Sequence, residues 1–128
     1  MKKYKIGFIC GAFDLIHPGV ILLFQEAKTI CEKLIIGIHE DPSLERKEKR
    51  KPIHTLLERE LMLWSIKYVD SIVHYKTEKN LYDLLISLNP NVRIQGGDYI
   101  NKRFTGDDLN IPIYYCNREH SYSYTQLR

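Results

Sequence analysis

The first 28 residues place a glycine-bearing turn between an apolar strand and a helix. Residues 4–10 form an apolar run typical of a buried strand, the turn 11–17 follows directly, and residues 21–28 have helical spacing. A junction of this kind points backbone N–H groups and the positive end of a helix dipole at one place. The stretch therefore predicts an anion site, suited to a phosphate, where the first strand ends.

The later sequence alternates strands with helices. Further strands are predicted at 33–38, 70–75, 92–95 and 111–116. Helices are predicted to begin at Pro18, at Thr55 and at Thr77, and Glu58 completes a capping box with Thr55. The helix faces expected to pack on the sheet are apolar residues at helical spacing: Val20, Leu23, Phe24, Ala27 and Cys31 in the first helix, Leu57, Leu61 and Trp64 in the second, and Leu81, Leu84, Leu85 and Leu88 in the third.

This alternation predicts an α/β fold, a Rossmann-like doubly wound parallel sheet in a single domain that spans residues 1–128. Ligands of such sheets bind at the carboxyl ends of the strands. The loops 11–17, 39–53, 96–106 and 117–125 each follow a predicted strand, so all four are expected at that edge. Candidate site residues are therefore sought in these loops.

Composition narrows the class of protein. The net charge is +3, without the broad basic stripe that nucleic-acid binding requires. No apolar segment approaches the ~20 residues that span a membrane, so we expect a cytoplasmic protein without membrane contact. Cys10, Cys31 and Cys116 lack paired spacing, which favours free thiols over disulfides or a zinc site. In 45–51, five basic residues accompany two acidic ones, which fits a solvated loop or a phosphate-binding one.

The block 11–20, Gly-Ala-Phe-Asp-Leu-Ile-His-Pro-Gly-Val, resembles the signature of the nucleotidyltransferase superfamily whose motif is written HxGH. It is most similar to the glycerol-3-phosphate cytidylyltransferase type, in which the block reads G-T-F-D-x-x-H-x-G-H. His17 and Gly19 match this motif, whereas Val20 stands where the second histidine belongs. The resemblance implies a nucleotide site at this turn.

Three later segments resemble the same superfamily. Lys51 and Arg59 fall on positions where the family contacts phosphates. The segment 95–99 resembles the family block G-D-D-W, with Gly96, Asp98 and Tyr99 matching in kind, and it is closer to the G-G-D-Y of the heptose-type family. The segment 118–125 resembles the nucleotide-binding block R-T-x-G-x-S-T-T. Its matching residues are Arg118, Ser123 and Thr125, and its departures are Glu119, Ser121 and Tyr124.

The resemblance implies attack by an acceptor phosphate on the α-phosphorus of a nucleoside triphosphate, with release of pyrophosphate. An acceptor phosphate is already anionic at neutral pH, so positioning and charge stabilisation are the main requirements. Mg²⁺ is expected to share the charge of the triphosphate, and no residue is assigned as its ligand. The implied catalytic residues are His17, Lys51 and Arg118. The implied nucleotide contacts are Gly11, Ala12, Phe13, Asp14, Gly19, Val20, Arg59, Gly96, Asp98, Ser123, Tyr124 and Thr125.

Each of these residues also has a structural interpretation: His17 can be purely structural, Gly96 can simply make a turn, and Asp98 can simply cap it. Asp14 either caps the turn or organises a ligand, and Arg59 either contacts phosphate or pairs with Glu58 or Glu60 on a helix surface. Valine at position 20 can neither donate a hydrogen bond nor carry charge. Losing one such donor costs on the order of 10² to 10³ in rate.

Several functions are therefore compatible with the sequence. The leading one is transfer of CMP from CTP to a small phosphomonoester such as glycerol 3-phosphate, by a homodimer. The alternatives are adenylyl transfer to a sugar 1-phosphate of the heptose type and nucleotide binding without catalysis. Three explanations remain for Val20: the donor comes from His54, His120 or a lysine of the basic loop, the chain is a degenerate copy, or the valine is an introduced change.

Overall fold

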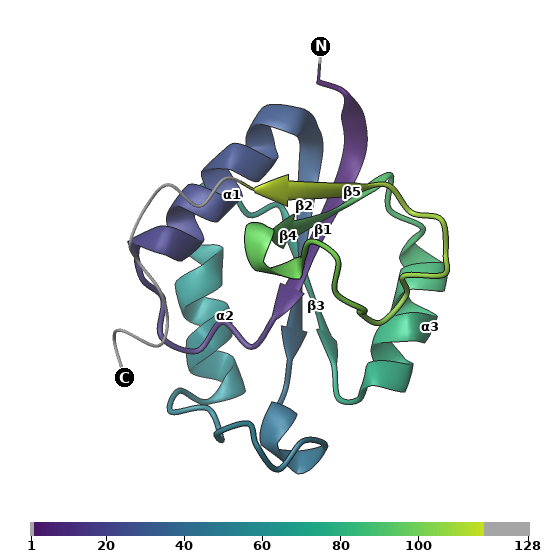
Figure 1. Cartoon of the computed structure of the whole chain (residues 1–128). Helices are drawn as coiled ribbons and strands as arrows, with labels where there is room; N and C mark the ends of the chain where they lie inside the picture. The colour runs from purple at the N-terminus through teal and green to yellow at the C-terminus, as the bar shows by residue number, and fades with distance from the viewer. Residues whose placement is uncertain (1, 117–128) are drawn as a thin grey trace.

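The computed structural model describes residues 2–116, and these form one parallel five-stranded sheet (Figure 1). The strands are β1 (Tyr4–Gly11), β2 (Cys31–His39), β3 (Ser71–Tyr75), β4 (Val92–Gly96) and β5 (Ile113–Cys116). Their order is β3-β2-β1-β4-β5, and every pairing is parallel. The chain begins at the central strand β1, adds β2 and β3 on one side of it, and then adds β4 and β5 on the other side. This change of side next to β1 confirms the doubly wound fold.

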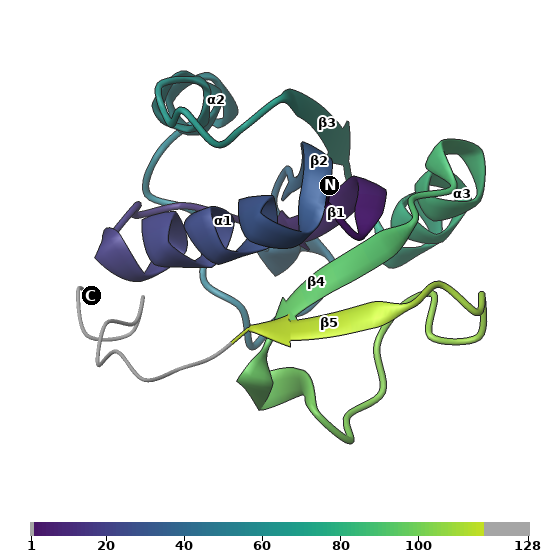
Figure 2. The ribbon, with the colours of Figure 1, turned by 90° about the horizontal axis from the view of Figure 1, so that it is seen from above.

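Three α-helices cover the two faces of the sheet in the part of the chain that the structure describes (Figure 2). Helices α1 (Pro18–Ile30) and α2 (Leu56–Trp64) lie on one face, and α3 (Glu78–Leu88) lies on the other. Two short 3₁₀ turns, η1 (Pro42–Leu44) and η2 (Gly97–Tyr99), follow β2 and β4. Each face has its own apolar core, with Phe24 and Leu63 on the α1 side and Leu81 and Leu85 on the α3 side. None of the described helices is both long enough and apolar enough to cross a membrane.

The predicted helix boundaries are confirmed by the caps that the structure contains. Pro18 is the first residue of α1, with His17 as its N-cap. Thr55 and Glu58 form both hydrogen bonds of the capping box, and the Thr77 hydroxyl accepts the N–H of Asn80 over 3.0 Å. The apolar face predicted for α3 is confirmed as well, because Leu81 and Leu85 are buried.

Cys31 was expected at the end of the first apolar helix stripe, and this is wrong. Helix α1 ends at Ile30, and Cys31 is the first residue of β2, paired with Tyr4 of β1. No loop separates α1 from β2, so Cys31 is buried in the core as a strand residue rather than as part of the helix. The three cysteines that were expected to be free are free thiols in the structure.

The apolar face predicted for α2 is also wrong. Leu57, Leu61 and Trp64 are 77%, 73% and 52% exposed, and the buried face of this helix consists of Arg59 and Leu63. The sequence of α2 has apolar residues at helical spacing on two opposite faces, and hydrophobicity does not distinguish them. The Arg59 side chain forms hydrogen bonds with backbone carbonyl oxygens at or just beyond the ends of β1 and β2, and these bonds determine which face of α2 points toward the sheet.

Candidate active site

His17 lies at the centre of the candidate site, between β1 and α1. It is buried, and its Nδ1 atom accepts the backbone N–H of Gly19 over 3.0 Å. Because Nδ1 accepts this bond, the neutral imidazole carries its proton on Nε2. One ring nitrogen thus caps the helix, and the other is a hydrogen-bond donor at the positive end of the α1 dipole.

Asp14 holds the turn to the long loop between β2 and α2. Its carboxylate, which is 3% exposed, accepts the backbone N–H groups of Ile53 (2.7 Å) and His54 (2.8 Å). The His54 ring contacts the same residue, with Nδ1 3.1 Å from the Asp14 carbonyl oxygen. The structure therefore gives Asp14 a structural role, close to the turn cap that the sequence suggests, and its role in organising a ligand stays a prediction.

Phe13 shapes the other side of the same turn. Its φ angle is +49°, a conformation that non-glycine residues seldom adopt. Its ring packs edge to face on Phe24 of α1, with the ring centroids 5.6 Å apart. This contact with a fully buried helix residue compensates for the unfavourable backbone conformation and fixes the path of 11–17 over the start of α1.

The Arg59 side chain extends from α2 toward the carboxyl ends of β1 and β2. It is 2% exposed, and its guanidinium donates to the carbonyl oxygens of Ala12 (3.0 Å), His39 (2.8 Å) and Glu40 (2.5 Å). These carbonyls lie just beyond or at the ends of β1 and β2, so one side chain ties two strand ends together. Arg59 is thus buried under the strand ends rather than placed on the helix surface. The phosphate contact of Arg59 stays a prediction.

Exchange of Arg59 for lysine is expected to lower the free energy of unfolding by about 2 kcal/mol. The planar guanidinium of arginine donates to three carbonyl oxygens at once, which the ammonium group of lysine cannot do. Leaving one buried carbonyl without its donor lowers stability by about 1–3 kcal/mol. Chemical denaturation with urea measures the change. Arg46→Lys is the matched control, because Arg46 makes a more exposed ion pair with Glu78 at 2.8 Å and should change stability little. Equal stabilities of the two variants would contradict the assigned role.

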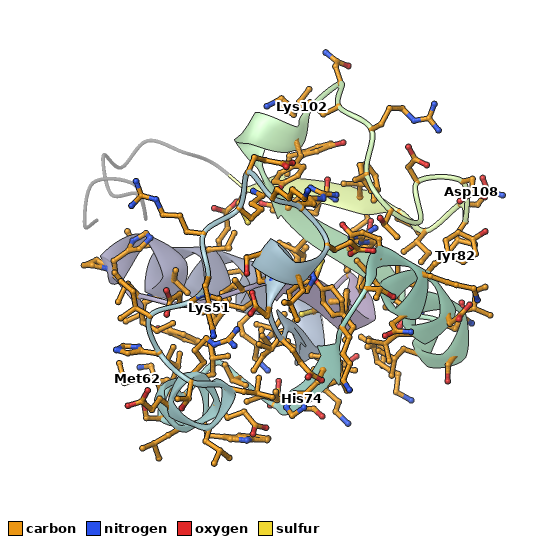
Figure 3. All side chains as sticks on the ribbon, turned by 90° about the horizontal axis from the view of Figure 1, so that it is seen from below. Lys51, Met62, His74, Tyr82, Lys102 and Asp108 are labelled. Atoms are coloured by element: carbon orange, nitrogen blue, oxygen red, sulfur yellow. The ribbon has the colours of Figure 1, made fainter. Side chains whose placement is uncertain are left out.

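A cavity of about 540 Å³ lies between the loop that follows β2 and the start of α2. Lys51, His54 and Arg59 line it, together with Lys76, which follows β3. Figure 3 shows Lys51 on the loop that crosses the carboxyl ends of the strands. The structure thus brings the predicted Lys51 and Arg59 to one cavity, beside the turn that contains His17.

Val20 occupies the position of the missing histidine in the first turn of α1. Its backbone N–H bonds to the His17 carbonyl over 3.0 Å, and its side chain packs on the core under α1. Of the substitutes suggested for this donor, His54 lies against the same turn through Asp14, and His120 lies outside the described residues.

The remaining predicted residues are distributed as follows. Gly11 ends β1, Gly19 is buried in α1, Gly96 ends β4, and Asp98 belongs to η2. Arg118, Ser123, Tyr124 and Thr125 lie outside the described residues, and so do the contacts predicted for them. Within 2–116, no group of three or more histidine, cysteine, aspartate or glutamate side chains is placed to hold a metal ion.

Sequence reasoning missed a set of buried polar residues near the strand ends. His39 (7% exposed), Arg93 (3%) and Gln95 (8%) point toward the α3 side of the sheet. The signal was present in β4, where Arg93 and Gln95 alternate with Val92 and Ile94. When polar and apolar residues alternate along a strand that is covered on both faces, the polar residues share one face and need polar partners there.

The strand order, the turn at the point of reversal and the histidine that caps α1 define a nucleotide-binding α/β protein of the Rossmann type. The family model described as cytidylyltransferase-like matches residues 8–118, and the chain belongs to this family of nucleotidyltransferases.

Relatives named bifunctional protein HldE support the same assignment. The protein from Hyphomonas neptunium is 36% identical over 106 residues, which are 82% of this chain and 22% of the relative. The protein from Helicobacter hepaticus is 37% identical over 109 residues, which are 84% of this chain and again 22% of the relative. The chain therefore spans about a fifth of the length of these relatives.

Solved structures share the fold. A lipopolysaccharide core biosynthesis protein from Thermoplasma volcanium superimposes with a TM-score of 0.75 at 20% identity, covering 91% of this chain and 99% of the other. A pantoate-beta-alanine ligase from Francisella tularensis has a TM-score of 0.61 at 21% identity, covering 93% of this chain and 62% of the ligase.

Proposed function

We propose that this chain transfers an adenylyl group from ATP to the phosphate of a small phosphomonoester such as a sugar 1-phosphate. The observation that supports this most directly is the state of His17. Its Nδ1 atom accepts the Gly19 N–H, so the neutral ring carries its proton on Nε2, at a helix N-terminus and beside backbone N–H groups of the turn. A neutral donor at this place suits the negative charge of a triphosphate.

In the proposed reaction, an oxygen of the acceptor phosphate attacks the α-phosphorus of the nucleotide. The bond from this phosphorus to the oxygen that bridges to the β-phosphate breaks, and pyrophosphate leaves. The acceptor needs no general base, because its second pKa is about 6. His17 donates to the phosphate chain, and Lys51 adds a positive charge from the rim of the cavity.

Mg²⁺ enters this reaction as part of the nucleotide substrate. The described residues offer no carboxylate cluster for it, and the Asp14 carboxylate is engaged by two backbone amides. Mg²⁺ is commonly held through substrate phosphates and water rather than by an all-protein cage. The chain's own contribution is to orient the phosphates.

The choice of ATP over CTP rests on two observations. The segment Gly96-Gly97-Asp98-Tyr99 resembles the G-G-D-Y of the heptose-type adenylyltransferases more closely than the G-D-D-W of the cytidylyl type. The relatives cited above also belong to one group of bifunctional proteins, all named HldE. These similarities favour the adenylyl alternative, and CTP becomes the second candidate.

Calorimetric titration of MgATP and MgCTP, followed by pyrophosphate release with mannose 1-phosphate and glycerol 3-phosphate, tests this proposal. Tighter binding of ATP together with release in the presence of the sugar phosphate is expected. Preferred use of CTP with glycerol 3-phosphate would replace the adenylyl assignment with the cytidylyl one. Binding without release in any combination would identify a nucleotide-binding protein without catalysis.

A second copy of this chain is proposed to cover the exposed face of α2. Leu57, Leu61 and Trp64 have the i, i+4, i+7 spacing of an interhelical contact, and such a stripe is self-complementary when two helices pair antiparallel about a two-fold axis.

The exchange Leu61→Glu is expected to convert this dimer into a monomer, because two negative charges would meet at the two-fold axis. Light scattering after size-exclusion chromatography measures the mass. Leu61 is 73% exposed, so the monomeric variant should remain folded, although its unfolding midpoint should fall by whatever the dimer contact contributes. Ile86→Glu on α3, where Ile86 is 56% exposed, is the matched control and should remain dimeric. A monomeric wild-type protein would rule out the self-association and leave the face to another protein segment.

A further inference from the structure

A polar cluster lies on the α3 face of the sheet, next to the carboxyl ends of β1 and β4. Phe8 of β1 is paired with Arg93 of β4, and the residues two positions further along, Cys10 and Gln95, share that face. Burial raises the pKa of the Cys10 thiol against the opposing effect of Arg93, so the thiol is neutral at pH 7. Cys10 directly precedes Gly11, where β1 ends and the turn 11–17 begins, so this cluster lies next to the turn that contains His17.

Arg93 brings a positive charge into this cluster. Its guanidinium donates to the carbonyl oxygen of Thr105 and to Cys10 Sγ at 3.5 Å, and it lies 5.0 Å from the centre of the Phe104 ring. Among the described residues, no carboxylate lies within ion-pair distance of it. The cluster is therefore a positively charged environment near the end of a central strand.

Gln95 has an unused hydrogen-bond acceptor in the same place. Its side chain is 8% exposed, and its Oε1 atom is buried without a hydrogen-bond partner among the described residues. A second such atom is Oε2 of Glu78 at the start of α3, whose Oε1 pairs with Arg46 over 2.8 Å. Buried acceptors normally have donors, and leaving one without a donor is unfavourable. Both atoms would be satisfied by hydroxyl groups.

We propose that this cluster binds the hydroxyl-bearing part of the phosphorylated acceptor, with Gln95 Oε1 accepting one of its hydroxyl hydrogens. The inference rests on the proposed function, since it assumes that the acceptor phosphate lies near His17 at the same edge of the sheet. It also selects the acceptor class. Arg93 repels an ammonium group, and Glu78 is already paired with Arg46, so a polyol or sugar phosphate is preferred to an amino-alcohol phosphate.

Gln95→Leu tests this assignment, because it removes the acceptor oxygen at nearly constant volume. The probes are glycerol 3-phosphate, mannose 1-phosphate and phosphoethanolamine, titrated by calorimetry in the presence of Mg²⁺ and a non-hydrolysable ATP analogue. In the wild-type protein, at least one of the two hydroxylated phosphates should bind about tenfold tighter than phosphoethanolamine. The variant should lose about tenfold in affinity for it, with unchanged affinity for phosphoethanolamine and for the ATP analogue.

Two further variants separate a binding role from a structural one. Gln95→Glu retains an acceptor oxygen and should bind the hydroxylated phosphates within about threefold of wild type. Ile94→Val changes the neighbouring residue on the opposite face and should lower the unfolding midpoint without changing acceptor affinity. If Gln95→Leu does not fold, the comparison of the three probes on the wild-type protein decides.

The outcomes distinguish this inference from the proposed function. Equal binding of the three probes by the wild-type protein, absence of binding by both hydroxylated phosphates, or unchanged affinity in a folded Gln95→Leu would overturn the acceptor site. The proposed function is decided separately, by binding of ATP or CTP and by release of pyrophosphate. Nucleotide binding and pyrophosphate release with an unselective acceptor would refute only the acceptor assignment.

Discussion

The exchange His17→Asn is expected to lower kcat/KM by roughly 10² to 10³, the usual effect of removing one donor to a developing negative charge. Asparagine is a good N-cap, and its side-chain oxygen can accept the N–H of Gly19 as His17 Nδ1 does. The variant should therefore keep the start of α1 while losing the imidazole Nε2–H. Steady-state pyrophosphate release, with nucleotide affinity measured by calorimetry, quantifies the loss.

The expected pattern for His17→Asn is a fall in kcat with an unfolding midpoint close to that of the wild type. His17→Ala is the matched control, because it removes both the cap and the donor and should lose about 1 kcal/mol of stability in addition. Equal activity of His17→Asn and the wild type would exclude His17 from catalysis. Equal stability of the two variants would mean that the bond to Gly19 contributes little to the helix.

The exchange Val20→His is expected to raise kcat by on the order of 10², because it adds a donor in the first turn of α1. Nucleotide affinity should change much less than the rate, since the added interaction would strengthen as charge moves to the leaving pyrophosphate. The side chain at this position is partly buried against the core, so the variant should also be somewhat less stable. Single-turnover pyrophosphate release and thermal unfolding measure the two effects.

Val20→Leu is the control, because it alters volume without adding a donor. A rise in rate for Val20→His but not for Val20→Leu would show that the wild-type chain lacks a catalytic group. Comparable rates for the wild type and Val20→His would indicate that another residue supplies the donor. His54, whose ring lies 3.1 Å from the Asp14 carbonyl, is then the residue to replace next.

Local signals in the sequence predicted most of the fold. The caps at Thr55 and Thr77 and the proline that opens α1 depend on residues within one turn of each other, so they can be predicted without tertiary structure. The outward position of Leu57 and Leu61 could not be predicted in this way. It depends on where the Arg59 side chain finds carbonyl oxygens, which belong to the end of β2 and to the residues that follow β1 and β2, far away in the sequence.

Only part of the candidate site could be predicted, because some of its bonds are local and others join residues that are far apart in the sequence. His17 and Gly19 lie on a contiguous motif, and their hydrogen bond is local. Asp14 and Arg59 were identified as site residues from their positions, but their observed bonds run to backbone groups 19 to 47 residues away. Gln95 and Arg93 carried a weaker signal, because polar residues in a short strand become informative only when both faces of the sheet are known to be covered.

The bonds of Asp14 and Arg59 have a consequence for how such a site can change. Both side chains hold backbone amide or carbonyl groups, so the path of the loop after β2 depends little on which side chains the loop itself carries. Substitutions within 43–51 can then alter charge and shape around the cavity while the chain keeps its course. If the proposed function holds, an architecture of this kind permits new acceptor preferences to arise by single amino-acid changes, without rebuilding the turn 11–17.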